Sequence, residues 1–554
     1  MVPAARIGSA TRCKLSVGWW LTLWGPLAVA LLPGSLAAQE LPASDQRYEI
    51  EVSLDTVRHW VTGREHIHLT NHSERPLPAL YFHLYANAFR DRHSVFMREG
   101  GARLRGGVLA HPGRCQVTSL RSSDGEELLS HAEHELIVGD QTQLRVALAR
   151  PLQPRAALDL ELTFRTELPQ MVARSGYAGE FHLVGQWFPK LARLEPQAGF
   201  VSFPYRGLGE FYADFADYTL TITLPARYQV AANGVRAVSR SHGTLRTDRF
   251  VATHVHDLVW AAYPYFIQKN VRVSGTQLQL YAPRGYSAAL ERQARVIGAA
   301  LPYFERRYGR YPYPQLSVVI PPSEALAASG MEYPTLFVSA GPFWALPAWA
   351  PDPQHDVVSV HELAHQWFSG MIASDEVAYP FLDEGLAEWA SLDFLRDFYA
   401  RPPSLFAAHA LPIEPFDIVR ALYARRDEAV PSSLLPITSY RYDTLARAVY
   451  MRPGLVFEAI AEHYGRLSLE AALARYARTQ RFRHPTPRDL FAAFDASFDA
   501  GFSRRVLEPA LAGEPRGPRS ALAPPPNRGR GLGAGSFSAE LLFVAQALLH
   551  WWGA

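Results

Sequence analysis

The chain has 554 residues, of which 48% are apolar and 19% are charged, a composition typical of a folded globular protein rather than a disordered one. This length exceeds what a single hydrophobic core usually supports, so two or three domains are expected. The formal net charge of +2 gives no reason to expect a nucleic acid or a strongly acidic partner.

Residues 1–38 have the pattern of a secretory signal peptide. Three basic residues precede a largely apolar stretch at 17–32, and small residues at 35–38 offer a cleavage site. We therefore predict an exported protein, either periplasmic or secreted. The alternative is an uncleaved membrane anchor, although Pro26 and Pro33 shorten any helix in this segment.

Short runs with alternating apolar side chains, separated by turns, follow from Tyr48 onwards. Residues 218–224 are the clearest run, and Asn233-Gly234 follows them as a turn. Few helical patterns interrupt these runs. We therefore predict an antiparallel β domain over residues 45–266.

The periodicity changes near residue 286. Residues 288–308 place their apolar side chains on one helical face, although Pro302 lies inside this stretch and is expected to kink the helix. Short buried strands are predicted at 316–320 and 335–339, and helical patterns dominate from there onwards. Residues 275–511 therefore predict a mixed domain, a small sheet followed by a helical half.

The C-terminal end changes composition twice. Residues 513–535 are rich in Pro, Gly and Arg, which is typical of a linker. Residues 537–554 are apolar again but short for a membrane span. We predict a helix there that docks on the protein or lies at a membrane surface.

Residues 361–365, with the pattern His-Glu-x-x-His, carry the strongest chemical signal in the chain. Residues four apart share a helix face, so His361 and His365 can offer two imidazoles to one metal ion, and Glu362 can reach a water on that ion. Glu384 follows after eighteen intervening residues and can complete a His₂Glu zinc set from a second helix. The alternative is a buried helix with two hydrogen-bonded histidines.

Two further motifs flank the metal pattern: Ser-Gly-Met-Glu-Tyr at 329–333 and Tyr-Met-Arg-Pro-Gly at 450–454. With residues 361–384 they resemble, in order and spacing, the aminopeptidase N family of zinc gluzincins. The resemblance covers residues 45–510 and implies an α+β multidomain fold. An N-terminal all-β saddle-like domain would be followed by a thermolysin-like mixed α/β catalytic domain with a helical half.

Two motifs depart from the family pattern. The family's Gly-Ala-Met-Glu-Asn segment has Ser329 first and Tyr333 last in this chain, and the usual Tyr-x-Lys-Gly reads Tyr-Met-Arg-Pro-Gly from residue 450. Neither change removes a catalytic atom. Both leave the preferred substrate open.

The resemblance implies a role for each residue of the metal site. His361, His365 and Glu384 would hold one Zn²⁺ per chain, which lowers the pKa of a bound water towards ~7 and polarises the scissile carbonyl. Glu362 would act as general base on the zinc-bound water and pass the proton to the leaving amine. Tyr450 would stabilise the oxyanion.

The resemblance also implies how a substrate binds. The backbone around Gly330 and Met331 would pair with the peptide as an added strand, and Glu332 would face its free α-ammonium group, so that one residue is removed at a time. Glu388, one turn after the last zinc ligand, either orients a ligand histidine or is a solvated helix carboxylate. Apart from the resemblance, residues 185–189 have the pattern of a packed turn, and a role for Gln186 in facing the substrate is the alternative.

These roles imply a zinc-dependent aminopeptidase that hydrolyses N-terminal residues from peptides with a free N-terminus. Two alternatives stay open: a catalytically inactive peptide-binding or scaffold protein with the same fold, and a thermolysin-type endopeptidase. The first is disfavoured because every required polar residue is present, and the second because an endopeptidase has no use for Glu332. No nucleic-acid partner is expected, and the apolar ends leave association with a membrane surface open.

Overall fold

The computed structural model describes residues between 41 and 513. The predicted signal segment, the linker beyond Gly513 and the apolar C-terminal segment lie outside the described residues and stay predictions. Within the part of the chain that is described, no helix is both long enough and apolar enough to cross a membrane. The described residues are 41, 44–101, 109–134, 136–340, 353–399, 414–424 and 429–513.

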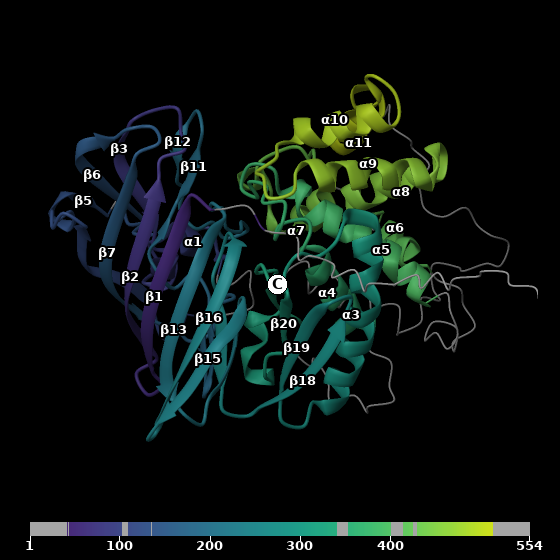
Figure 1. Ribbon diagram of the computed structural model, residues 1–554. Coiled ribbons are helices and arrows are strands. Elements are labelled where there is room, and N and C mark those ends of the chain that lie inside the picture. The colour runs from purple at the N-terminus through teal and green to yellow at the C-terminus, as the bar shows by residue number, and fades with distance from the viewer. Residues whose placement is uncertain are drawn as a thin grey trace, which may run out of the picture. The chain divides into compact units, whose positions relative to one another are not determined.

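Seven strands form the largest sheet, in the order β15-β16-β13-β1-β2-β7-β4 (Figure 1). Every second side chain of β1 and β13 is buried, as the alternating pattern predicts. One pair departs from the predicted antiparallel arrangement: β1 and β13 are parallel, because the long stretch of chain between them serves as the crossover that parallel strands need. The strands are β1 (Gln46–Asp55), β2 (Trp60–Thr70), β4 (Arg114–Ser122), β7 (Ala157–Glu167), β13 (Ala216–Pro225), β15 (Val235–His242) and β16 (Leu245–Val255).

Three smaller sheets complete the β domain, with the orders β10-β3-β6-β5, β14-β17-β9-β8 and β11-β12. Their strands are β3 (Leu77–His83), β5 (Ala132–Glu133), β6 (Gln143–Leu152), β8 (Gly176–Ala178), β9 (Phe181–Val184), β10 (Lys190–Leu191), β11 (Arg193–Glu195), β12 (Gly199–Val201), β14 (Gln229–Ala232) and β17 (Trp260–Tyr263). Among the described residues of this domain, the helices are short: η1 (Tyr85–Phe89), α1 (Val95–Arg98) and η2 (Leu129–His131). The many short strands agree with the predicted all-β first half.

A separate four-stranded sheet, β18-β19-β20-β21, opens the second half of the chain. Its strands are β18 (Phe266–Val273), β19 (Thr276–Pro283), β20 (Gln315–Val319) and β21 (Leu336–Val338). β18 pairs along its whole length with β19. β19, β20 and β21 are parallel, and helix α3 (Ser287–Tyr308) connects the first two.

Helices make up the rest of the second half, as predicted. Helix α3 continues through Pro302 to Tyr308. The others are η3 (Ser323–Ala328), α4 (Pro353–Ala364), η4 (Pro380–Leu382), α5 (Glu384–Tyr399), α6 (Pro415–Tyr423), η6 (Ile437–Ser439), α7 (Tyr442–Leu445), η7 (Ala446–Met451), α8 (Arg452–Tyr464), α9 (Arg466–Thr479), α10 (Pro487–Ser497), η8 (Ser503–Leu507) and α11 (Glu508–Ala512).

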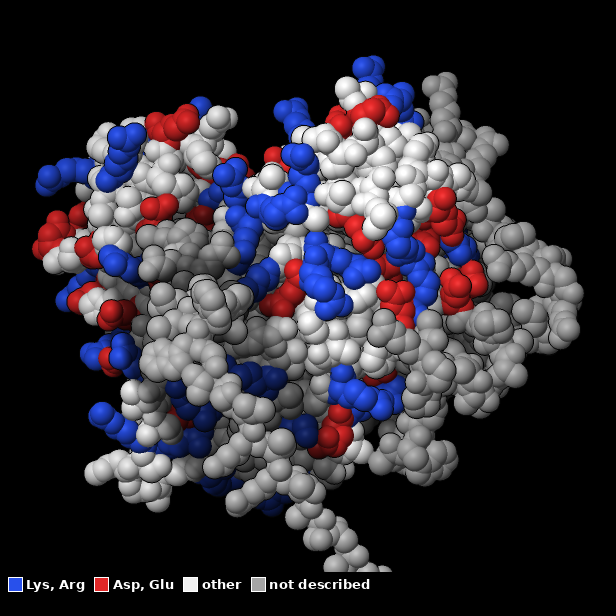
Figure 2. All heavy atoms as spheres, turned by 45° about the vertical axis from the view of Figure 1, so that its right-hand side comes forward, with Lys and Arg blue, Asp and Glu red and all other residues white. Residues whose placement is uncertain are grey.

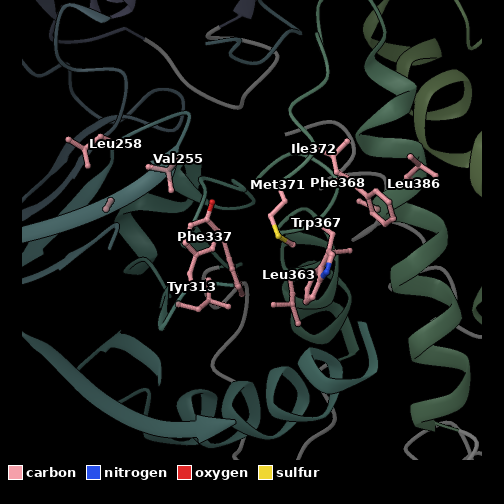
Figure 3. Close-up of a cluster of buried hydrophobic side chains, with 14 of the residues drawn as sticks. Val255, Leu258, Tyr313, Phe337, Leu363, Trp367, Phe368, Met371, Ile372 and Leu386 are labelled. Atoms are coloured by element: carbon pink, nitrogen blue, oxygen red, sulfur yellow. The ribbon is translucent and has the colours of Figure 1, made fainter. Parts of the chain in front are cut away.

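Buried apolar side chains hold α4 and the turn after it in place (Figure 3). Leu363, Trp367 and Phe368 are at most 1% exposed, and Leu386 from α5 is fully buried. The Trp367 indole N–H also donates to the Gly309 carbonyl, at 2.8 Å, just beyond the end of α3. Truncating a large buried side chain typically costs about 3–5 kcal/mol, so this packing fixes the two helices relative to each other.

The surface carries charges of both signs. Figure 2 shows basic and acidic side chains interspersed over the face that it draws, in keeping with a net charge of +2. Exposed ion pairs such as Arg64 with Glu51, 2.7 Å apart, contribute little to stability because water screens them.

Candidate active site

The His-Glu-x-x-His pattern lies at the end of helix α4. His361 and Glu362 belong to its last turn, the helix ends at Ala364, and His365 follows in a turn. The His365 N–H donates to the His361 carbonyl at 3.2 Å, so the two imidazoles stay one helical turn apart, as predicted. The side chains are buried, with His361 and His365 1% exposed and Glu362 2% exposed.

Glu384, the first residue of α5, meets the two histidines. The Nε2 atoms of His361 and His365 lie 2.8 Å apart. Glu384 Oε2 is 3.0 Å from the first of these atoms and 3.1 Å from the second. The structure therefore brings the three predicted metal ligands together as one group of buried donors.

Carboxylates hold the opposite edges of both imidazole rings. Asp383 Oδ1 pairs with His365 Nδ1, and Glu388 Oε2 lies 3.4 Å from His361 Nδ1. When each Nδ1–H points to its carboxylate, each Nε2 turns a lone pair towards Glu384. Glu388 thus lies where a residue that orients a ligand histidine is expected.

This donor set fits zinc. Converging lone pairs beside a carboxylate repel one another unless a cation lies among them, and zinc takes a His₂Glu set with Zn–N bonds of about 2.0–2.1 Å. Tetrahedral angles then require nitrogens about 3.3 Å apart. The His361–His365 pair, at 2.8 Å, therefore needs to open by only about half an ångström to accept the ion.

Burial and charge shift the pKa values of this group. Burial and the neighbouring His365 lower the pKa of His361, but hydrogen bonds to Glu384 and Glu388 outweigh them and raise it to about 9. Burial raises the pKa of Glu384, but the charges and hydrogen bonds of the two histidines prevail and lower it. Burial is the main cause that raises the pKa of Glu362 to about 8, and the nearby Glu332 carboxylate adds to the shift.

Tyr450 reaches the same group from helix η7, a π-helix. Its hydroxyl donates to Glu384 Oε1 at 2.5 Å, and its ring stacks beside His361 at a centroid distance of 6.0 Å. A π-helix adds a residue to a helical turn and recurs at functional sites. The structure therefore places the predicted oxyanion donor beside the metal ligands.

The segment that begins at Gly330 lies alongside strand β21. Gly330 has a φ of +67°, which its lack of a side chain permits. The Gly330 N–H donates to the Val338 carbonyl at 3.0 Å, and Met331 exchanges backbone hydrogen bonds with Val338 of 3.2 and 2.9 Å. These backbone groups are already paired within the protein, so pairing with a substrate falls to other groups of the segment.

Gln366 ties this segment to the metal site. Its side-chain amide donates to the Tyr333 carbonyl at 3.1 Å, and its side-chain oxygen accepts from the Thr335 N–H at 2.8 Å. Gln366 follows the ligand His365 directly in the chain. The position of Glu332 is therefore coupled to that of the metal ligands.

Glu332 faces a pocket to which the β domain contributes. The pocket is lined by Glu210, Phe211, His256, Asp257, Met331, Glu332, Tyr333, Pro334, Ser369 and Glu376. Two of these carboxylates have basic partners: Arg174 forms an ion pair with Glu210, and Lys190 lies 2.9 Å from Asp257. Gln186 donates to Asp257, so its side chain supports the wall of the pocket.

Several residues of this site lie outside the motifs found in the sequence. Asp383 and Glu376 are buried acids that lie between His365 and Glu384 in the sequence. The acidic Leu-Asp-Glu-Gly stretch marks Asp383, but no sequence pattern marks Glu376. Glu210 and Arg174 come from the β domain. Their sequence signal is weak, because each is a single charged residue in a domain with many aromatic residues. Their role depends on contacts distant in sequence.

Comparisons with known proteins agree with this geometry. Residues 289–503 match the peptidase family M1 domain. The chain is 27% identical over 184 residues to aminopeptidase M1-B of Oryza sativa subsp. japonica, which covers 32% of this chain and 21% of the rice protein. It is 26% identical over 181 residues to aminopeptidase N of Acetobacter pasteurianus, which covers 31% of this chain and 51% of that protein. The chain thus matches about a fifth to a half of the length of these relatives.

Solved structures share the fold over much more of the chain. An M1 zinc metallopeptidase from Deinococcus radiodurans superposes with a TM-score of 0.56 and 17% identity, over 89% of this chain and 96% of its own. A mutant of that protein bound to a Tyr-Ser-Ala substrate gives a TM-score of 0.56 and 16% identity, over 86% and 94% of the two chains. At this identity the likeness shows a common α+β architecture with a β-rich first part and a helical second part.

Proposed function

Because the chain belongs to the aminopeptidase N family of zinc metallopeptidases, peptidase family M1, we propose that it is a zinc-dependent aminopeptidase acting on peptides with a free N-terminus. The observation that carries the proposal is the convergence of His361, His365 and Glu384, with Glu362 and Glu332 within reach of the same space. One Zn²⁺ per chain is the cofactor that this set implies.

Zinc bound by His361, His365 and Glu384 supplies a Lewis acid that polarises a carbonyl and lowers the pKa of a water. The protein's own carboxylates keep the ligands in place. Asp383 and Glu388 hold the Nδ1 edges of the two imidazoles, which directs both Nε2 lone pairs towards Glu384.

Glu362 is the general base. Its Oε2 atom is buried and has no hydrogen-bond partner in the described part of the chain, so this oxygen is available to accept a proton. Burial, followed by Glu332, raises the pKa of Glu362 to about 8, which suits a group that takes up a proton and returns it to a leaving amine near neutral pH.

Tyr450 is the donor to the oxyanion. In the structure its hydroxyl donates to Glu384. Burial is the largest cause that raises the pKa of Tyr450, and the Glu384 charge adds to it, so the hydroxyl stays protonated and able to donate. Loss of such a donor typically lowers the rate about 10²–10³-fold.

Glu332 selects the end of the peptide. Its carboxylate is 5% exposed and lines the pocket next to the metal ligands. A free α-ammonium group can form a charge-assisted hydrogen bond there, whereas an acylated amine cannot. This pairing distinguishes an aminopeptidase from a thermolysin-type endopeptidase.

The proposal is tested on purified protein by metal analysis and by hydrolysis of matched substrates with a free and an N-acetylated N-terminus. We expect one zinc per chain, loss of activity with a chelator, and cleavage of the free-amine substrates only. Glu362→Gln should keep the zinc and lose turnover. Absence of zinc, an active Glu362→Gln variant, or internal cleavage of acetylated peptides would each count against the proposal.

We also propose that the protein is exported, on the basis of the signal pattern in residues 1–38. The intact mass of the protein recovered from its native host should correspond to a chain that starts near Ala38 or Gln39. Recovery of the full chain from the membrane fraction would instead support an anchor.

A further inference from the structure

Arg452 is a buried cation two residues after Tyr450. It is 3% exposed and is the first residue of α8, directly after the π-helix η7 that carries Tyr450. The proposed mechanism gives Arg452 no part. A charged side chain is costly to bury unless hydrogen bonds replace the water that it loses, so the contacts of its guanidinium group show what holds it there.

Four hydrogen bonds replace that water, and their acceptors come from three separate segments. Arg452 Nε donates to the Tyr423 hydroxyl, in the last residue of α6, at 3.1 Å. Its Nη atoms donate to the backbone carbonyls of Val430 at 2.9 Å, Pro431 at 2.5 Å and Leu511 at 3.4 Å, the last of these in α11. The guanidinium group therefore ties the end of α6, a connecting segment and α11 to the start of α8.

The connecting segment shares an apolar cluster with Tyr450. Val430, whose carbonyl accepts from Arg452, and Tyr450 both pack on a cluster formed by Ile437, Tyr440, Leu445, Ala448 and Val449. Because the guanidinium group fixes the backbone at Val430, it also fixes one of the side chains that surround the cluster beneath Tyr450.

The two residues after Arg452 contact helix α5. A Cβ atom at Gly385 would lie 2.5 Å from a carbon of the Pro453 side chain, so the start of α5 passes in direct contact with the start of α8. A Cβ atom at Gly454 would lie 3.2 Å from the Glu388 side chain. The stretch that carries Tyr450 is therefore held against α5 by Pro453 and Gly454, and against α6, α11 and the connecting segment by Arg452.

We propose that Arg452 is a positioning residue for Tyr450, which holds the backbone that aims the Tyr450 hydroxyl at the space beside the metal ligands. This inference rests on the proposed function and deepens it. A donor to a developing oxyanion must be placed to within a fraction of an ångström, and a displacement of about 1 Å can lower the rate about 100-fold.

The test compares Arg452→Met and Arg452→Lys with wild type, each as the zinc-loaded full chain, on an alanyl aryl amide. Arg452→Met removes all five N–H donors, so kcat should fall about 10- to 100-fold. KM and zinc content should stay unchanged, because the Tyr450 hydroxyl stabilises the transition state and not the bound substrate. Arg452→Lys keeps the charge and three N–H donors and should recover part of the lost kcat.

The decisive comparison uses Tyr450→Phe, which removes the hydroxyl itself. Adding Arg452→Met to Tyr450→Phe should lower kcat by no more than about 2-fold, because residues that act as one unit have non-additive effects. Arg307→Met is the matched control. Arg307 is 18% exposed and pairs with Asp393 and Glu470, which are not residues of the metal site, so its loss should lower the melting temperature and leave kcat unchanged.

Equal kcat losses from Arg452→Met in the wild-type and Tyr450→Phe backgrounds would overturn the inference and leave the aminopeptidase proposal intact. A loss that falls on KM alone would do the same. If circular dichroism shows that Arg452→Met does not fold, the same comparison is made with Arg452→Lys, and an unchanged kcat or an equal loss in both backgrounds would overturn the inference. A fully active Tyr450→Phe variant would overturn both this inference and the role proposed for Tyr450.

Discussion

Zinc affinity should depend on Asp383 more than on any other residue that does not itself bind the ion. Asp383 is fully buried, and its Oδ1 atom pairs with Nδ1 of the ligand His365. The Asp383→Ala variant loses the charge that makes this imidazole a better electron-pair donor. The Phe368 carbonyl, 3.0 Å from the same nitrogen, remains to orient the ring. Loss of such a partner typically weakens metal binding about 10- to 100-fold, or about 1.4–2.7 kcal/mol.

The structure also predicts an order among variants. Glu388 lies 3.4 Å from His361 Nδ1, a longer and weaker contact than the one made by Asp383, so Glu388→Gln should cost less than Asp383→Ala. Asp383→Asn keeps an oxygen acceptor without the charge and should lie between them.

Competition with a chromophoric chelator measures the zinc dissociation constants without relying on activity. Circular dichroism of each zinc-free variant confirms that it is folded. The reasoning is wrong if folded Asp383→Ala binds zinc as tightly as wild type, or if Glu388→Gln has the larger effect.

Two further predictions concern packing and pH. A Cβ atom at Gly185 would lie 2.3 Å from the Tyr333 hydroxyl, so Gly185→Ala should displace the segment that carries Glu332 and lower kcat/KM for free-amine substrates about 10- to 100-fold. Gly298→Ala is the control: its Cβ would be in ordinary contact with a Val273 methyl group, at 3.7 Å, so kcat/KM should stay unchanged. Burial lowers the pKa of four histidines from 6.5, to about 3 for His83 and His182 and to about 4 for His254 and His256. These imidazoles stay neutral in the folded chain but take up protons in the unfolded chain below about pH 6.5. Their contribution to the free energy of unfolding is therefore present above that pH and is lost as pH falls, by up to about 2 kcal/mol per histidine at pH 5. The raised pKa values of His361 and Glu362 shift the stability of the zinc-free protein the other way, so the check is an NMR titration of the four imidazoles themselves, and a ring that titrates near pH 6.5 in the folded protein would contradict the reasoning.

Local periodicity predicted those parts of the structure that depend on neighbouring residues. The alternation in residues 218–224 became β13, and the helical pattern of 288–308 became α3. The spacing of His361 and His365 was sufficient to predict that both meet one ligand group, because a helical turn fixes their separation. The prediction that Glu384 is the third metal ligand required one further assumption, namely that a second helix brings it back to the two histidines.

Contacts between distant segments could not be predicted in the same way. The parallel pairing of β1 with β13 joins strands from opposite ends of the β domain, and periodicity carries no information on which strands pair. The approach of Glu376 to Glu332 likewise depends on how the turn after α4 packs against the segment beside β21. Burial of an acid in a loop leaves no pattern in the sequence.

Contacts with the β domain help to fix the position of the segment at 329–333 that carries Glu332. Arg174, Gln186 and Thr335 all have positive φ angles, of 50°, 51° and 63°, a conformation that costs non-glycine residues about 1–3 kcal/mol each. Neighbouring contacts hold them there: Arg174 pairs with Glu210, Gln186 donates to Asp257, and the Thr335 N–H donates to the Gln366 side chain. The Tyr333 hydroxyl donates to the Arg174 carbonyl at 3.2 Å, which links the β domain directly to the residue after Glu332. A substitution at position 174 or 186 should therefore disturb the position of Glu332, although both residues lie in the other half of the protein and belong to none of the three motifs.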